Sequence, residues 1–261
     1  MKPEDIQPLI KEFNRLSKGT VDFYKYTWYS ITHHSTGIEG STLSGSQVIN
    51  LLEYGKPANN KPFEHHLMVK DYFNALNFVI EAAQKKHEIT PAFISKIGSL
   101  VMQNTGSEVN SIAGTYNTAK GEFRKGTVRA GTRTFPDYSK VPVLMKNLCS
   151  QANNDLKNAK TFQQQCNLSF WLHFQFVSIH PFGDGNGRTA RLLMNYIQAC
   201  FGLPLSVVFK SDRISYINAL EATRKTENIE TFHRFMYNQY AKFLKSEITE
   251  MKPKLSKKSG K

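Results

Sequence analysis

The chain has few cysteines, and their spacing indicates neither a disulfide framework nor a zinc site. Three occur in 261 residues, Cys149, Cys166 and Cys200, and no two of them form a C-x-x-C pair. Cys166 and Cys200 lie within apolar helical patterns. An odd number of such cysteines is typical of small buried hydrophobic residues in a reducing compartment, so we expect a cytoplasmic protein.

Long apolar runs are also absent. No stretch of about 18 consecutive apolar residues occurs, which excludes a membrane-spanning helix. Residues 1–5 lack the apolar segment of a signal peptide. The sequence therefore predicts a soluble globular protein without a membrane partner. Its hydrophobic content of 40% is enough for a sizeable buried core.

Acidic residues are scarce relative to basic ones. The chain has 34 lysines and arginines against 21 aspartates and glutamates, which gives a net charge of +13. Such a surplus favours polyanions, phosphorylated ligands or acidic protein surfaces. Part of the surplus lies in residues 251–261, which contain five lysines and no acid. We therefore predict that residues 246–261 form a basic, disordered tail.

Apolar residues recur at intervals of three and four over most of the chain, which predicts helices. They are expected near residues 4–17, 21–39, 48–54, 65–86, 91–101, 139–156, 162–179, 186–200, 212–226 and 229–245. The segment 162–179 has almost no charge and should be a buried central helix. Between residues 105 and 139 the helical period disappears, which indicates loops and one two-stranded ribbon around Gly126 and Gly131. The predicted fold class is all-α with one hairpin.

Twelve residues, from His180 to Arg191, combine a base, a carboxylate, three glycines and two arginines in the order HPFGDGNGRTAR. Asp184 is an oxygen ligand of the kind that magnesium takes. Gly185, Asn186 and Gly187 can turn successive backbone N–H groups toward one point and so form an anion-binding nest. Asn186 is the predicted N-cap of the next helix, whose positive end would lie at the same place. These features together predict a phosphate site.

Two arginines and a histidine flank this nest. Arg188 and Arg191 are three residues apart, so both lie on one face of the helix, where they can hold further phosphate oxygens. His180 follows an apolar run and precedes a proline, at a junction between helix and loop. Its ordinary pKa suits a general base near neutral pH. Each residue alone would usually be structural, and only the joint pattern indicates an active site.

The joint pattern resembles the signature of the Fic family, H-x-F-x-D/E-G-N-G-R-x-x-R. All eight defining positions are met, by His180, Phe182, Asp184, Gly185, Asn186, Gly187, Arg188 and Arg191. Further segments are similar to the family's flap hairpin and its flanks, namely residues 121–124, 128–131 and 135–136. Residues 35–40, STGIEG, are similar to the S/T-x-x-x-E-G/N inhibitory motif of the subclass that carries this motif ahead of the core.

The resemblance implies a Fic-type helical bundle with one β-hairpin flap. It divides the chain into four parts: an N-terminal helix (1–19), an inhibitory-helix region packed on the core (20–64), the Fic core (65–245) and the tail (246–261). It also implies the reaction. AMP would move from ATP, bound with Mg²⁺, to a Tyr, Thr or Ser hydroxyl of a target protein or of the chain itself, and pyrophosphate would be released.

The same resemblance assigns roles to individual residues. His180 would be the catalytic base, Asp184 the Mg²⁺ ligand, and Phe182 the anchor of the loop. The residues expected to bind ATP and its phosphates are Gly183, Asp184, Gly185, Asn186, Gly187, Arg188 and Arg191. The target protein would bind as an added strand along the flap, through the backbone of Val128, Arg129, Ala130 and Gly131.

Two further assignments concern regulation and the nucleoside. Glu39 would inhibit the enzyme by occupying Arg191, and Ser35, one helical turn earlier, would steady it. A carboxylate on Arg191 takes the donors that the γ-phosphate of ATP needs. Tyr216 lies in the region where family members contact the base or ribose, and it is a candidate nucleoside contact.

Several alternatives remain at this point. The same site could transfer a uridylyl, phosphocholine or phosphate group, or remove AMP from a modified protein. Kinase-type relatives usually alter the third position of the G-N-G triplet, so the intact Gly187 favours AMP transfer. A nucleic-acid-binding module is the alternative from a different class. The scattered basic residues, and the lack of a recognisable winged-helix extension after residue 245, disfavour it. The sequence leaves a homo-oligomer open.

Overall fold

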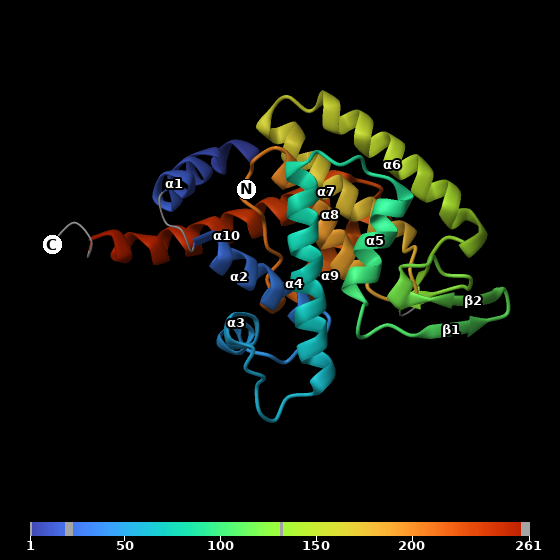
Figure 1. Cartoon of the computed structure of the whole chain (residues 1–261). Helices are drawn as coiled ribbons and strands as arrows, with labels where there is room; N and C mark the ends of the chain where they lie inside the picture. Colours follow the sequence, from blue (N-terminus) through green and yellow to red (C-terminus); the bar gives the residue numbers. More distant parts are fainter. Residues whose placement is uncertain (1, 19–22, 131–132, 257–261) are drawn as a thin grey trace.

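Two helices, α7 (Phe162–Ile179) and α8 (Asn186–Cys200), lie in the middle of the fold. The computed structural model describes residues 2–18, 23–130 and 133–256. α7 packs along α8, and the long helix α4 (Phe63–Gln84) also packs on α8 (Figure 1). The interior of α7 includes Phe170 and Phe176, both with no exposed surface. The prediction of a buried central helix is therefore confirmed.

The start of α7 is specified locally. Thr161 is the N-cap and accepts a hydrogen bond from the backbone of Gln164 (3.2 Å), while the Gln164 side chain accepts one from the backbone of Thr161 (3.0 Å). This reciprocal capping box satisfies two N–H groups that a helix start leaves without partners. From there an almost uncharged sequence continues through the core to the loop that carries His180.

The remaining helices surround this pair. They are α1 (Gln7–Ser17), α2 (Phe23–Ile38), α3 (Gly45–Tyr54), α5 (Pro91–Val101), α6 (Val141–Asn158), α9 (Arg213–Thr226) and α10 (Ile229–Ser256). Short 3-10 turns lie at η1 (Pro3–Asp5), η2 (Thr118–Lys120), η3 (Tyr138–Lys140) and η4 (Lys210–Asp212). α2 packs against α4 and α8 and ends just before Gly40, whose φ of 104° suits glycine. The all-α fold class is confirmed.

The described residues contain two hairpins, both between α5 and α6. β3 (Arg129–Ala130) pairs antiparallel with β4 (Arg133–Thr134), where the sequence predicts the flap; Gly131 lies outside the described residues. A second hairpin, β1 (Glu108–Ser111) with β2 (Gly114–Asn117), projects from the same end of the molecule (Figure 1). The expected number of one hairpin was too low. Only Tyr116 of β1 and β2 is buried, so these strands lack the apolar alternation that would have predicted them.

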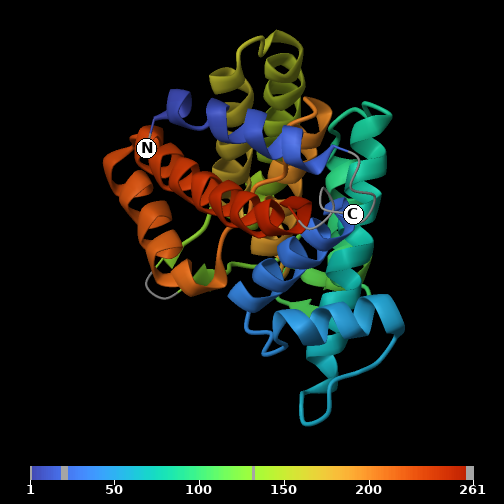
Figure 2. The ribbon, with the colours of Figure 1, turned by 90° about the vertical axis from the view of Figure 1, so that its left-hand side faces the viewer.

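The prediction of a disordered tail from residue 246 is wrong for residues 246–256, which continue α10. Ile248 and Met251 are buried, because this end of α10 packs on α1 (Figure 2). Lys252 also lies within ion-pair distance of Glu12 on α1, 3.9 Å. The prediction was based on the lysine-rich composition and overlooked Ile248 and Met251, two apolar residues at helical spacing. Their burial keeps the segment folded.

The cysteines are free thiols. Cys149 and Cys166 are buried, as the sequence predicts, and burial raises the pKa of the Cys149 thiol to about 12. Cys200 is only half-buried. Within the described ranges, none of the helices combines the length and the apolar character needed to cross a membrane.

The docking of α10 on α1 predicts a stability effect. Ile248→Ala should lower the free energy of unfolding by about 2 kcal/mol, because it leaves a cavity between the two helices. In a chain of this size the loss corresponds to about 4–8 °C in Tm, measurable by thermal unfolding. Thr249→Ala, one residue further on the exposed face, is the control and should leave Tm nearly unchanged. An unchanged Tm for Ile248→Ala would mean that this end of α10 contributes nothing to folding.

Candidate active site

The loop between α7 and α8 is closed by the side chain of Asn186. Its Oδ1 accepts a hydrogen bond from the backbone N–H of Phe182 (3.0 Å), and its Nδ2 donates to the backbone carbonyl of Phe182 (2.9 Å). Asn186 is therefore not the N-cap, as the sequence suggested, but the first helical residue. The cap is Gly185, with a φ of 79°. An amide side chain carries both a donor and an acceptor, so it can pair with both backbone groups of one residue.

Phe182 anchors the loop in the core, as expected. Its ring is 2% exposed and packs against the rings of Phe123 and Phe176, with centroid distances of 5.7 and 5.9 Å. A Cβ atom on Gly98 of α5 would come within 2.7 Å of this ring. The motif loop is thus held both by a backbone clamp and by a buried aromatic side chain.

An anionic side chain of the chain itself, Glu39, lies at the N-terminus of α8. The first N–H groups of a helix have no acceptor within the helix and carry partial positive charge. A Cβ atom on Gly187 would come within 2.4 Å of Glu39 Oε1. The Glu39 carboxylate thus lies directly over the backbone that the sequence predicts to bind phosphate.

Arg191 holds this carboxylate in place. Arg191 Nη2 donates to Glu39 Oε1 (2.7 Å) and to the backbone carbonyl of Ser35 (3.0 Å), and Nε donates to Ser35 Oγ (2.7 Å). The guanidinium is almost completely buried, whereas the Glu39 side chain is 32% exposed. The predicted contact of Glu39 and Ser35 with Arg191 is confirmed; its inhibitory effect is a separate question.

The pair is charged at neutral pH. Burial alone would raise the pKa of Glu39, but the charge and hydrogen bond of Arg191 outweigh it, so this pKa lies below its ordinary value. A carboxyl group with a lowered pKa keeps its ion pair above its ordinary pKa and loses it only as the pH falls through the lowered value. Mild acidification would therefore not release Glu39.

Arg188 and Asp184 form the other side of the site. Arg188 is buried, and its Nη2 donates to Asp184 Oδ1 (3.3 Å) and lies 3.1 Å from the sulfur of Met102. Its Nε and Nη1 are buried and find no acceptor within the part of the chain that the structure describes. Asp184 is 66% exposed. The site thus combines unused buried donors with one carboxylate that is open to solvent.

His180 directly follows the last residue of α7 as its C-cap and adopts the left-handed conformation, with φ 55° and ψ 60°. Its ring stacks on Phe135, with a centroid distance of 3.9 Å and an interplanar angle of 19°. Burial lowers the pKa of His180 to about 4, and the nearby cations act in the same direction against one opposing hydrogen bond from the ring to the backbone carbonyl of Val177. The imidazole is therefore neutral near pH 7, as a proton acceptor must be.

The flap lies against this histidine through the residue that follows β4. Phe135 stacks on His180, and the Arg133 guanidinium lies over the Phe135 ring, 4.4 Å from its centroid. Val128 accepts a backbone hydrogen bond from Phe135 (3.4 Å). Of the four residues predicted to bind the target, Val128, Arg129 and Ala130 are described and Gly131 is not.

The structure places Tyr216 in the core. Its side chain is buried, and its hydroxyl forms a hydrogen bond with His173 Nε2 (3.0 Å). Burial raises the pKa of Tyr216 to about 12. The contact of Tyr216 with a nucleoside stays a prediction.

Several residues that shape the site were not assigned to it from the sequence. Tyr116 on β2 leaves no room for a side chain at Gly183, because a Cβ atom there would come within 2.8 Å of its ring. Arg213 on α9 donates to the carbonyl of Ile38 (2.8 Å), the last residue of α2, and so helps to fix Glu39. These contacts join segments that are far apart in the chain, and no local pattern marks them.

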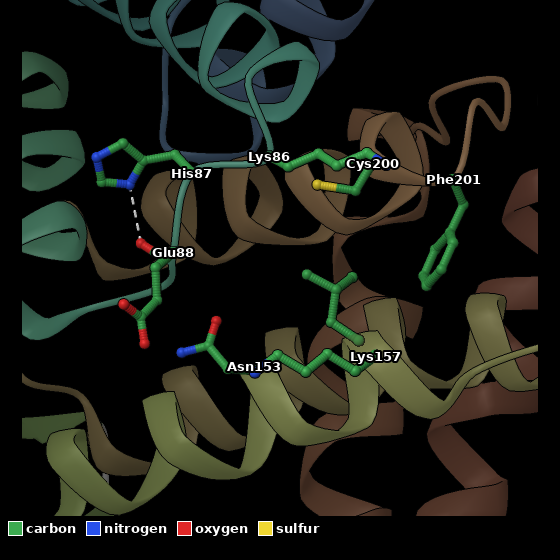
Figure 3. Close-up of a pocket in the computed structure, with 8 residues that line it drawn as sticks. Lys86, His87, Glu88, Asn153, Lys157, Cys200 and Phe201 are labelled. Atoms are coloured by element: carbon green, nitrogen blue, oxygen red, sulfur yellow. Dashed lines mark hydrogen bonds between the residues drawn. The ribbon is translucent and has the colours of Figure 1, made fainter.

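A cavity of about 590 Å³ lies elsewhere, at the C-terminal end of α8. Figure 3 shows the residues that line it, among them Lys86, His87, Asn153, Lys157 and Cys200. His87 forms a hydrogen bond with the backbone oxygen of Glu88 (2.9 Å). None of the residues that line this cavity belongs to the motif, which lies at the opposite end of α8.

Comparison with known proteins finds relatives of the chain. The chain is 29% identical over 212 residues to the protein adenylyltransferase Fic of Drosophila willistoni, covering 81% of this chain and 40% of the relative. It is 30% identical to that of Drosophila erecta over the same length, again 40% of the relative. The chain thus spans about 40% of the length of these curated relatives.

Solved structures show the same fold. A Fic domain containing signaling protein from Bacteroides thetaiotaomicron superposes with a TM-score of 0.79 at 23% identity, covering 95% of this chain and 98% of that one. Fic-1 from C. elegans (residues 134–508) superposes with a TM-score of 0.80 at 26% identity, covering 97% and 72%. The sequence model of the Fic/DOC family matches residues 88–198, and the chain therefore carries a Fic/DOC family domain.

Proposed function

We propose that the chain is a protein adenylyltransferase, which transfers AMP from Mg-ATP to a hydroxyl group of a target protein or of the chain itself, and which Glu39 inhibits. One observation carries this proposal. Arg191 binds an anionic group, the Glu39 carboxylate, and holds it next to Gly187 at the start of α8, the helix that follows the loop of His180. The relatives named protein adenylyltransferase Fic support the same reaction.

The geometry suits an in-line displacement at phosphorus. His180 would accept the proton of the target hydroxyl. The hydroxyl oxygen would form a bond to the α-phosphorus of ATP as the bond to the bridging oxygen breaks and pyrophosphate leaves. The N–H groups at the start of α8 would bind the phosphate oxygens, where negative charge accumulates during the reaction. Positioning and charge stabilisation supply most of the catalysis in such transfers.

Asp184 fits the role of a Mg²⁺ ligand. Its carboxylate is largely exposed, and the described residues contain no group of three or more His, Cys, Asp or Glu side chains that could hold a metal by themselves. Mg²⁺ usually binds one or two carboxylates together with waters and substrate phosphates. Asp184 would therefore hold the ion jointly with ATP, and the ion would neutralise phosphate charge.

The flap would position the target. The flap consists of the two-residue strands β3 and β4, and its free strand edge can pair with the main chain of an extended segment. This mode would use the backbone of Val128, Arg129, Ala130 and Gly131 and would read little of the target's sequence. The stack of Phe135 on His180 places the base directly beside the flap.

The intact Gly187 supports AMP transfer over the alternatives within the class. With no side chain at this position, the backbone is open to a phosphate group once Glu39 leaves. Transfer of another phosphate-containing group and removal of AMP would use the same residues. Labelled ATP distinguishes these reactions.

Inhibition follows from the position of Glu39. The carboxylate occupies Arg191 and lies over Gly187, so a phosphate in the same place would meet both its volume and its charge. An equilibrium between an inhibited and a competent state shifts from about 1% to about 99% competent when the competent state is stabilised by about 5.5 kcal/mol. A change of about 1.4 kcal/mol already alters the ratio of the two states tenfold. An ion pair with a buried arginine, braced by Ser35, is a reasonable source of such a bias.

The identity of the transferred group can be tested with labelled nucleotide. In the Glu39→Gly background with magnesium, label from α-labelled ATP should become bound to protein, whereas label from γ-labelled ATP should not. His180→Ala should reduce the transfer by roughly 10² to 10⁴, because it removes the base, while nucleotide binding measured by calorimetry persists. Label from the γ position alone would instead establish kinase chemistry.

The inhibitory role is tested by comparing the parent with Glu39→Gly at saturating Mg-ATP. We expect at least a roughly tenfold gain in AMP transfer and no gain in Tm, because the variant only removes a contact. Glu88→Gly is the matched control, since it removes an exposed loop carboxylate near the far end of α8. Arg191→Ala should not reproduce the gain, because it also removes the phosphate clamp. Equal rates for parent and Glu39→Gly, both folded and binding ATP, would exclude the inhibition.

The lowered pKa of His180 predicts an unusual pH profile. A base whose pKa is about 4 stays neutral above that pH, so kcat/KM of Glu39→Gly should show no loss from His180 protonation between about pH 5 and 7. The acidic limb should appear only near pH 4. Circular dichroism at each pH controls for unfolding. A limb near pH 6.5 would show that the ring is not buried in the free enzyme.

A further inference from the structure

We infer that Arg124 is a positioning residue that ties both ends of the flap to the backbone of His180, so that the flap and the catalytic base move as one unit. The inference rests on the proposed role of His180 as the base. It concerns a residue that lies in the segment between the two hairpins and contacts neither ATP nor target in the proposed mechanism.

Arg124 is among the largest completely buried side chains of the protein, with 2% of its surface exposed. Its guanidinium donates to backbone carbonyls. Nε donates to His180 (2.8 Å), Nη1 to Gly126 (2.8 Å) and Nη2 to Pro136 (2.5 Å), with a longer contact from Nη2 to Ile179 (3.5 Å). Burying a guanidinium is costly unless its donors are satisfied, so this arrangement is maintained by several bonds at once.

The backbone of Arg124 joins the same connection. Its N–H donates to the carbonyl of Pro181 (2.9 Å). One residue thus contacts the carbonyls of Ile179, His180 and Pro181, three successive residues at the end of α7. The last carbonyls of a helix lack donors within the helix, and Arg124 donates hydrogen bonds to the carbonyls at this helix end.

His180 needs such support because its backbone is in the left-handed conformation, with φ 55°. A residue with a Cβ atom occupies this conformation at an energetic cost, so the surroundings must hold it there. The hydrogen bond from Arg124 Nε fixes the His180 carbonyl, and the stack on Phe135 fixes the ring. The backbone and the ring of His180 are thereby both held by residues next to the flap.

The other two contacts of Arg124 lie at the two ends of the flap. Gly126 precedes β3, and Pro136 follows β4 and is adjacent to Phe135. A displacement of the flap would therefore pull on both Arg124 and Phe135, and through them on His180. When a target segment binds along the flap, any displacement of the flap would also move His180 through the Arg124 guanidinium.

The first test follows the ring of His180 by NMR and needs no catalysis. The Cε1–H signal of His180, assigned by its loss in His180→Ala, is titrated in the parent, Arg124→Lys and Lys125→Met. Lysine offers a single point charge and cannot reach four carbonyls. We expect the pKa of His180 to rise toward its ordinary value in Arg124→Lys, because the ring becomes less buried. The Lys125 ammonium donates to the carbonyl of Thr115 on β2 (2.8 Å), away from His180, so Lys125→Met should titrate like the parent.

The second test measures AMP transfer in the Glu39→Gly background. Arg124→Lys should lower kcat about 100-fold while the KM for ATP changes by less than about threefold, since misplacement of a base by about 1 Å has an effect of this size. Free guanidinium at a concentration well below its denaturing range should restore part of the rate of Arg124→Ala and none of the rate of His180→Ala.

A third test uses the parent alone and remains available if every Arg124 variant unfolds. The amides of Arg124 and Phe135 should exchange hydrogen in one opening event with similar rates. A Phe135 amide that exchanges more than about tenfold faster would show that the flap moves without Arg124 and would overturn the inference. So would a folded Arg124→Lys with parental kcat and an unchanged His180 titration. If Glu39→Gly transfers nothing, the proposed function fails, while the titration and exchange still decide the role of Arg124.

Discussion

The buried guanidinium of Arg191 requires an anionic acceptor, and the rest of the site depends on which group supplies it. Arg191 is 2% exposed and lies in α8. The first N–H groups of this helix also lack acceptors within the helix. Leaving such a charge unpaired in the interior would be strongly destabilising. Glu39 supplies the acceptor from within the chain, and this contact also attaches the end of α2 to α8. A phosphate that replaced Glu39 would have to supply the same pairing, so occupancy of the site and docking of this helix end are one equilibrium.

Much of the site could be predicted from the sequence because its chemistry is local. The segment from His180 to Arg191 places a base, a carboxylate and two arginines on one loop and one helix turn, and helical periodicity locates both flanking helices. The position of Glu39 also followed from sequence, since an apolar helix that stops at Gly40 leaves little freedom at its end. Its pairing with Arg191 required the resemblance to the inhibitory motif, because 152 residues separate the two.

What the sequence did not predict depends on contacts between distant segments. Asn186 has the composition of an N-cap, yet the loop uses its amide to close on Phe182. The hairpin from Glu108 to Asn117 has few buried residues, so its strands carry no apolar alternation. The end of α10 has the composition of a disordered tail, yet Ile248 and Met251 find a surface on α1. In each case tertiary packing overrides a local preference.

The structure also bears on which kind of ligand the positive net charge of the chain favours. The two arginines of the motif, Arg188 and Arg191, are almost fully buried. Such side chains cannot follow a nucleic-acid backbone, which needs exposed cations along an extended surface. They can pair with a compact anion at the start of α8, where a low dielectric strengthens each contact. The two buried arginines of the motif therefore support the proposed phosphorylated small molecule over a nucleic acid, a choice that the net charge alone does not make.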